Sequence, residues 1–219
     1  MIKIKIIIFG ILFLLLSYFI YCGQPYVLLV SMDGFRWDYL NRNITPSINK
    51  FADSNVKALS LMPVFPSKTF PNHYSIITGL YAENHGIISN SFLNPFDGSK
   101  YSLSDKIAVT NSYWYKGEAF WETAKRNGII TASYFWPGSE VDLEYRKPDY
   151  FVKYQHDTRF EDRVKGVINW LTLPYEKRPH FLTLYFHEPD AISHSKGVFS
   201  NETNEMLRRM DTCLLYTSP

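Results

Sequence analysis

The sequence contains an apolar run, Tyr26-Val27-Leu28-Leu29-Val30-Ser31-Met32, which ends at Asp33-Gly34. Continuous apolar residues over this length are typical of a strand buried on both faces, as in a parallel sheet. Further strands are expected at 56–61, 129–135 and 181–186, helices at 45–53, 118–127, 159–171 and 201–210, and an irregular segment at 90–115. This alternation predicts an α/β fold with a mainly parallel central sheet and helices on both faces.

A second stretch, Lys68-Thr69-Phe70-Pro71-Asn72-His73-Tyr74, is expected to bring the hydroxyl of Thr69 to the start of a helix. Pro71 suits the first helical position, because its missing N–H would have no partner there, and Gly79 is suited to end the helix. Two roles are open for Thr69. It is either an N-cap whose oxygen accepts a backbone N–H, or a nucleophile at a helix start that favours anions such as phosphate.

Polar or aromatic residues follow three of the predicted strands, namely Asp33, Trp136 and Asp190. Ligands of parallel sheets bind beyond the carboxyl ends of the strands, so these residues are expected at one edge. Asp190 and His194 are spaced i, i+4, which places both on one helical face where they can hold one ion. Taken singly, Asp33 is more often a turn residue or helix cap, and the pair Asp190–His194 is more often a pair on a solvated surface.

These motifs together resemble one family. The matching segments are Met32-Asp33-Gly34-Phe35-Arg36, Lys68 to His73, Gly79-Leu80-Tyr81 through His85-Gly86-Ile87 to Asn90, Trp136-Pro137-Gly138-Ser139, Arg178-Pro179-His180-Phe181, and Glu188-Pro189-Asp190 followed by His194. They look like the nucleotide pyrophosphatase/phosphodiesterase family, the ecto-enzyme branch of the alkaline phosphatase superfamily. The resemblance runs from about residue 26 to residue 211 and implies an alkaline phosphatase-like fold.

The resemblance implies two Zn²⁺ ions in the complete domain. Asp33 and Thr69 would belong to one zinc, and Asp190 and His194 to the other. Thr69 would be the nucleophile, activated because metal coordination lowers the pKa of a hydroxyl. Asn90 would donate a hydrogen bond to a phosphoryl oxygen. The implied cycle forms a covalent phosphothreonine diester, which water then hydrolyses, with the two metals stabilising the attacking and leaving oxygens.

A nucleotide slot is also implied by the resemblance. Phe70 and Tyr154 match positions that sandwich a nucleobase, and Trp136 and Tyr185 would line the pocket. Stacking of this kind tolerates any base, although core packing is the alternative for each aromatic residue taken singly. One departure lies near this slot: His187 stands where an acidic residue is common. The expected substrates are extracellular nucleotides with a pyrophosphate or phosphodiester bond.

Residues 1–23 have the layout of a secretory signal peptide, with Lys3 and Lys5 before an apolar run. An uncleaved signal anchor is the alternative. The formal net charge of +2 is accounted for by these two lysines. The rest of the chain is therefore near neutral, which argues against a nucleic-acid polymer as partner.

Two sequons, Asn43-Ile44-Thr45 and Asn201-Glu202-Thr203, predict N-glycosylation at Asn43 and Asn201. Together with the signal segment they predict a protein that is secreted or lies on the extracellular face of the plasma membrane. Membrane attachment through a C-terminal segment beyond this chain, or through the N-terminal anchor, is open.

Residues 24–211 are expected to form the N-terminal part of the catalytic domain, and residues 212–219 a divergent tail that does not continue the last helix. Because the family's remaining metal ligands would follow, the chain by itself is expected to be inactive. Two other functions are open. One is a lysophospholipid or choline-phosphate esterase of the same family, which would need acidic groups around an aromatic cage. The other is a catalytically inactive secreted binding protein.

Overall fold

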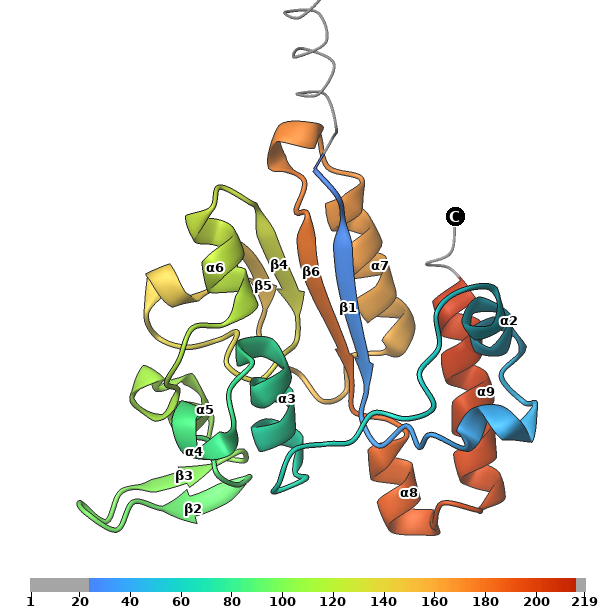
Figure 1. The fold of residues 1–219 in the computed structure, drawn as a ribbon, viewed down its shortest axis with the longest axis horizontal. Helices are drawn as coiled ribbons and strands as arrows, with labels where there is room; N and C mark the ends of the chain where they lie inside the picture. Colours follow the sequence, from blue (N-terminus) through green and yellow to red (C-terminus); the bar gives the residue numbers. More distant parts are fainter. Residues whose placement is uncertain (1–23, 216–219) are drawn as a thin grey trace, which may run out of the picture.

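The computed structural model describes residues 24–215 (Figure 1). In this range the main sheet has the strand order β1-β6-β4-β5, and every neighbouring pair is parallel. Its strands are β1 (Val27–Met32), β4 (Thr131–Tyr134), β5 (Tyr150–Val152) and β6 (Phe181–Phe186). A separate antiparallel hairpin is formed by β2 (Ser91–Leu93) and β3 (Lys100–Ser102). The prediction of a mainly parallel α/β fold is confirmed.

The helices connect and flank these strands. They are α2 (Pro46–Ser54), α3 (Thr69–Thr78), α4 (Ala82–His85), α5 (Lys106–Thr110), α6 (Phe120–Arg126), α7 (Phe160–Leu171), α8 (Asp190–Lys196) and α9 (Asn201–Leu215). Short 3-10 turns are η1 (Tyr39–Arg42), η2 (Ser112–Trp114), η3 (Glu144–Arg146) and η4 (Tyr175–Lys177).

Helices cover both faces of the sheet, as predicted, and β6 shows why. Successive side chains of a strand point to opposite faces. Leu182, Leu184 and Phe186 are buried in one core with α7 and α9. Tyr185 is buried in the other core, with α3 and α6. In Figure 1, α7 and α9 accordingly lie on one side of the strands and α3 and α6 on the other.

Two strand predictions are wrong. β1 was expected to be buried on both faces, but it is an edge strand of the described sheet and is only half-buried, with Val27 50% exposed. The segment 56–61 forms no strand. Its apolar side chains Val56, Leu59 and Leu61 are exposed instead, because no strand of residues 24–215 lies beside them to pair with.

The end of the last helix was also predicted wrongly. α9 continues past residues 210 and 211 to Leu215, because Met210 and Cys213, three residues apart on one helical face, are both buried against α7 and β6. Within the segment predicted to be irregular, 90–115, the β2–β3 hairpin and α5 are ordered elements. β5 has only three residues and was not foreseen.

Residues 1–23, which carry the predicted signal peptide or anchor, and residues 216–219 of the predicted tail lie outside the described residues. Between residues 24 and 215, no helix combines the length and apolar character that crossing a membrane requires.

Candidate active site

Thr69 is the first residue of α3, and Lys68 is its N-cap. The first main-chain bond of the helix runs from the N–H of Asn72 to the carbonyl of Lys68 over 3.0 Å. Pro71 therefore occupies the third helical position rather than the predicted first, where its missing N–H is still not needed. Gly79 ends the helix as expected, with φ of 70°.

The hydroxyl of Thr69 is not used for capping. No hydrogen bond between residues 24 and 215 involves it, and the N-cap makes no side-chain bond. The N-cap alternative for Thr69 is therefore not observed. At α2, by contrast, Thr45 stands at the N-cap, but its hydroxyl caps no backbone N–H and instead donates to Asn49.

Asn90 fixes the start of α3 from outside the helix. Its Oδ1 accepts the main-chain N–H of Phe70 over 3.0 Å. Because an amide has one acceptor oxygen and two N–H donors, this contact leaves the Nδ2 donors available. Asn90 and Thr69 line the same hollow, so the amide can serve a ligand that contacts Thr69.

His73 ties Thr69 to the sheet. Its Nδ1 donates to the carbonyl of Thr69 over 2.7 Å, so its Nε2 accepts from the hydroxyl of Ser31 in β1, also over 2.7 Å. Trp136 Nε1 donates to the carbonyl of His73 over 3.0 Å. Burial lowers the pKa of His73, which keeps the ring neutral in this bridging role. The sequence signal for this role is the i, i+4 spacing to Thr69.

Asp33 and Asp190 come together at the carboxyl ends of β1 and β6. The N–H of Asp190 donates to the carbonyl of Asp33 over 2.9 Å, and Tyr185 donates its hydroxyl to Asp33 Oδ2 over 2.9 Å. His194 Nε2 lies 3.4 Å from Asp190 Oδ1, with the imidazole largely exposed. The structure therefore brings the predicted pair Asp190–His194 together and places Asp33 beside it.

Two hollows meet at these residues. An aromatic cavity of about 220 Å³ lies on one side and an open hollow of about 590 Å³ on the other. Asp33, Thr69 and Asp190 line both. The residues lining the aromatic cavity also include Phe70, Leu103, Val109, Tyr115, Phe135, Trp136, Pro137, Gly138, Glu140, Tyr154, Tyr185, His187 and Ala191. Thr69 thus belongs to the wall that the two hollows share.

The carboxylates carry an electrostatic cost that a cation would relieve. Burial and the neighbouring charge of Asp33 raise the pKa of Asp190. Two carboxylates, an imidazole and a hydroxyl are suitable ligands for Zn²⁺. No group of three or more His, Cys, Asp or Glu side chains within residues 24–215 is placed to hold a metal by itself. The residues present fit part of a metal site.

All four predicted pocket aromatics, Phe70, Trp136, Tyr154 and Tyr185, line the aromatic cavity. Tyr154 is 40% exposed, whereas Trp136 and Tyr185 are almost fully buried and pack edge-on against His73. Among the described residues, no ring contact joins Phe70 to Tyr154. A flat ligand between these two rings remains a prediction.

Glu140 is a cavity residue that the sequence did not indicate. Its Oε1 accepts the N–H of Tyr154 over 2.7 Å, and burial raises its pKa. This contact holds the backbone of Tyr154 at the cavity wall. The motif around Trp136 ends at Ser139, one residue earlier, so the only signal was the position of Glu140 next to that motif.

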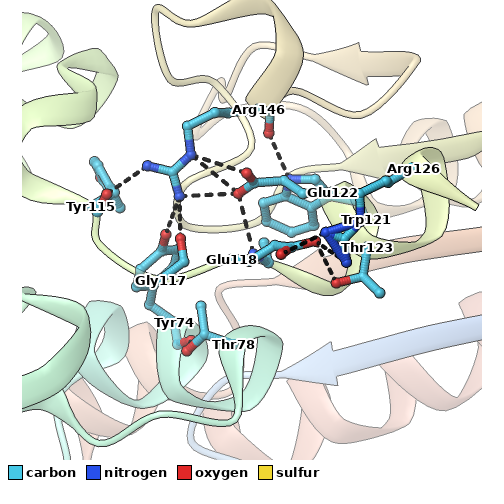
Figure 2. A network of polar contacts seen from close by, with 11 residues as sticks. Tyr74, Thr78, Tyr115, Gly117, Glu118, Trp121, Glu122, Thr123, Arg126 and Arg146 are labelled. Carbon is cyan, nitrogen blue, oxygen red and sulfur yellow. Dashed lines mark hydrogen bonds and ion pairs between the residues drawn. The ribbon is translucent and has the colours of Figure 1, made fainter.

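Arg146 is the centre of a network of polar contacts that includes one residue of the cavity wall, Tyr115 (Figure 2). Its guanidinium pairs with Glu122 over 3.0 Å and donates to the carbonyl of Tyr115 over 2.6 Å and to the hydroxyl of Tyr74 over 3.3 Å. Tyr115 lines the cavity, and Tyr74 belongs to α3. One buried arginine therefore links the cavity wall to the helix that carries Thr69.

Comparisons with known proteins show the family of this chain. A family model described as "Type I phosphodiesterase / nucleotide pyrophosphatase" matches residues 27–217. The chain belongs to this family. It is 45% identical over 189 residues to ectonucleotide pyrophosphatase/phosphodiesterase family member 1 of Homo sapiens, covering 85% of this chain and 20% of that protein. It is 42% identical over 193 residues to venom phosphodiesterase of Naja atra, covering 87% of this chain and 23% of that protein.

A solved structure shares the fold. It is murine ectonucleotide pyrophosphatase/phosphodiesterase 5, as an inactive threonine-to-alanine variant in complex with AMP. The TM-score is 0.82 at 34% identity, over 88% of this chain and 51% of that one. The chain therefore spans about a fifth of the length of the curated relatives named above and about half of the solved relative. The alkaline phosphatase-like, mainly parallel fold expected of a phosphodiesterase of this family is confirmed.

Both predicted glycosylation sites of this family member are sterically open. Asn43 follows η1 and Asn201 begins α9, and both asparagines are exposed. The threonines of the two sequons, Thr45 and Thr203, are buried. N-glycosylation at these positions remains a prediction.

Proposed function

We propose that the complete protein is a zinc-dependent phosphodiesterase/pyrophosphatase that hydrolyses extracellular nucleotides with Thr69 as nucleophile. The observation that carries this proposal is the hydroxyl of Thr69. It has no partner among residues 24–215, and Thr69 lies in the wall shared by the two hollows, with Asp33 and Asp190 beside it. The inactive threonine-to-alanine variant of the solved relative supports a threonine nucleophile.

In the proposed reaction, Thr69 Oγ1 gives up its proton to solvent and attacks phosphorus. The bond from phosphorus to the leaving oxygen breaks, and the leaving oxygen takes up a proton from solvent. Water then attacks the same phosphorus and releases Thr69 with its proton restored. The start of α3 favours the negative charge of the phosphoryl group, and Asn90 donates from Nδ2 to one of its oxygens. His73 holds the backbone of Thr69 in place during both displacements.

The carboxylates of Asp33 and Asp190 are suitable ligands for the proposed zinc ions. Asp33 and Thr69 would hold one Zn²⁺, and Asp190 and His194 the other, with the remaining ligands supplied outside residues 24–215. Bound zinc would supply charge for the attacking and leaving oxygens and lower the pKa of the threonine hydroxyl. Residues 24–211, with the rest of α9, would then be the N-terminal part of a catalytic domain, and the chain alone would be inactive.

The aromatic cavity supports a nucleotide as the ligand. Phe70 and Tyr154 line it without touching each other, and Trp136 and Tyr185 close it from the core. The complex of the solved relative with AMP is consistent with a base in this space. The substrate would be a small nucleotide diester or pyrophosphate, not a nucleic-acid polymer.

One observation supports a second candidate function, that of a choline-phosphate or lysophospholipid esterase. The carboxyl group of Glu140 belongs to the same cavity as Trp136 and Tyr154, and an acidic group within an aromatic cage suits a quaternary ammonium. Assays of a nucleotide ester and a choline-phosphate ester side by side distinguish the two. Faster hydrolysis of the choline ester would favour the second candidate.

An extracellular site of action is part of the proposal. The relatives' names include an ectonucleotide pyrophosphatase and a venom phosphodiesterase, which supports a secreted protein or one on the outer face of the plasma membrane. The experiment that tests the function is hydrolysis of the p-nitrophenyl ester of thymidine 5′-monophosphate by the full-length protein, with and without a zinc chelator. Turnover that persists unchanged after chelation would contradict the proposed metal dependence, and no turnover under any metal loading would favour the inactive binding protein.

A further inference from the structure

Arg163 of α7 is completely buried behind the aromatic cavity. Its guanidinium donates to the carbonyl oxygens of Tyr185 over 3.0 Å and Thr158 over 3.1 Å, and lies 4.9 Å from the ring centre of Phe135. Within residues 24–215 no carboxylate forms an ion pair with it. A buried cation without a counter-ion depends on the neutral acceptors around it.

A further acceptor is the imidazole of a second cavity residue, His187. Arg163 Nη2 lies 3.1 Å from His187 Nδ1. A guanidinium has donors only, so Nδ1 must accept and the proton of the neutral imidazole is on Nε2. Burial, and then the charge of Arg163, lower the pKa of His187 to about 4. His187 is therefore held as a neutral ring with one defined tautomer.

The surroundings of His187 leave one edge of the ring for a ligand. His156 stacks on its face, with 4.2 Å between the ring centroids. Phe160 meets the imidazole in a T-shaped arrangement, with 5.6 Å between the ring centroids. The Nδ1 edge is turned towards Arg163 behind the wall. No hydrogen bond within residues 24–215 engages Nε2, and His187 lines the aromatic cavity, so Nε2–H is free to donate to a molecule inside it.

We propose that His187 determines specificity by donating from Nε2–H to a hydroxyl oxygen of the substrate's sugar. This inference rests on the proposed nucleotide function. A phosphoryl group at Thr69 and Asp190 and a base between Phe70 and Tyr154 leave the sugar between them. His187 lies three residues before Asp190 on that side of the cavity. The cavity already holds three carboxyl groups, so a neutral donor recognises the sugar without adding charge.

The test compares three p-nitrophenyl esters in the full-length protein: those of adenosine 5′-monophosphate, its 2′,3′-dideoxy analogue, and methyl phosphate. In the wild type, KM for the ribose ester should be about fivefold lower than for the dideoxy ester, as expected for one neutral hydrogen bond. His187→Phe keeps a ring against His156 but has no donor, so this ratio should fall to about one. His187→Gln, which retains an N–H donor, should recover much of it.

His180→Phe is the matched control, because His180 is another imidazole stacked on an aromatic ring, that of Tyr26, and does not line the cavity. It should keep the wild-type ratio. Equal KM values for the ribose and dideoxy esters in the wild type would overturn the inference even if no variant folds. The same holds if His187→Phe raises KM equally for all three esters. Failure of the wild type to hydrolyse any ester would contradict the proposed function instead.

Discussion

The main-chain N–H of Asp190 donates a 2.9 Å hydrogen bond to the carbonyl oxygen of Asp33. This bond joins the end of β1 to the start of α8, two segments more than 150 residues apart in the chain. It sets the two carboxylates at the same place, beside Thr69. Gly34 makes the approach possible, because a Cβ at this residue would lie 2.7 Å from Asp190 Cα.

Gly34→Ala should therefore separate the two carboxylates. Gly34 has φ of +70° and faces backbone atoms that cannot rotate away. We expect a loss of unfolding free energy of about 2–5 kcal/mol, from left-handed strain plus overpacking, with loss of zinc and of diester turnover. Gly79→Ala is the control, since its φ is also +70° but no atom lies within 4 Å. It should cost only the strain, about 1–2 kcal/mol, and keep turnover. Equal effects of the two substitutions in urea unfolding and turnover assays would contradict the role given to Gly34.

Thr69→Ala should remove nearly all diester hydrolysis while leaving the fold intact, because the hydroxyl makes no bond to residues 24–215. Thr69→Ser should retain partial activity, since a hydroxyl remains. Thr78→Ala, at the other end of α3, removes a hydroxyl that bonds to Tyr74 and should leave turnover near the wild-type value. The measurement is kcat on a chromogenic nucleotide ester. Turnover of Thr69→Ala within a few-fold of the wild type would rule out the nucleophile.

Tyr154→Ala should raise KM for nucleotide esters by about 5–150-fold, the equivalent of about 1–3 kcal/mol of stacking on a base. An ester without a base should be affected much less. Tyr145→Ala is a suitable control, because Tyr145 is 70% exposed and does not line the cavity. An equal loss on both kinds of ester would show that Tyr154 has a structural role.

Stability should fall when the pH drops below the ordinary pKa of histidine. His85 is fully buried, bonds to Ser75 over 2.8 Å and accepts the N–H of Ile87 at Nδ1. Burial lowers its pKa. As the pH falls, His85 is therefore protonated in the unfolded chain before it is protonated in the folded protein. This stabilising contribution is complete above about pH 6.5 and decreases as the pH falls towards the folded pKa.

The measurement is the urea midpoint at pH 7.5 and pH 5.5. His85→Gln should show a smaller decrease between the two values than the wild type. A remaining decrease is expected from His73 and His187, whose pKa values are also lowered by burial. An identical decrease in His85→Gln and the wild type would show that His85 does not titrate on unfolding.

The sequence predicted those elements whose signals are local. β6 has the predicted bounds because Phe181–Phe186 is apolar throughout and central in the sheet. The amphipathic helix α7 was predicted to within one residue. Val56 and Leu59 look like strand residues, but whether they pair depends on chain far away in the sequence, and no periodicity reveals it. The three-residue β5 is too short to carry a pattern.

The sequence placed Asp33, Thr69, Asn90 and Asp190 near the ends of elements and predicted Asp33 and Asp190 at one edge of the sheet. The structure brings these four residues together around one hollow, and their chemical roles remain predictions. Two of the contacts that hold them join residues distant in sequence and could not be predicted: the hydrogen bond between Ser31 and His73 and that from Arg146 to Tyr115. Such bonds depend on the packing of β1, α3 and α6 rather than on spacing.

Thr69 should become covalently attached to the nucleotide during turnover. The most direct measurement incubates the full-length protein with a nucleotide ester labelled at the α-phosphorus, quenches with acid during turnover, and maps the label by peptide mass spectrometry, with Thr69→Ala as control. We predict a nucleotidyl group on Thr69 in the wild type and none in the variant. Rapid turnover with no label on Thr69, or a label on another residue, would contradict the account.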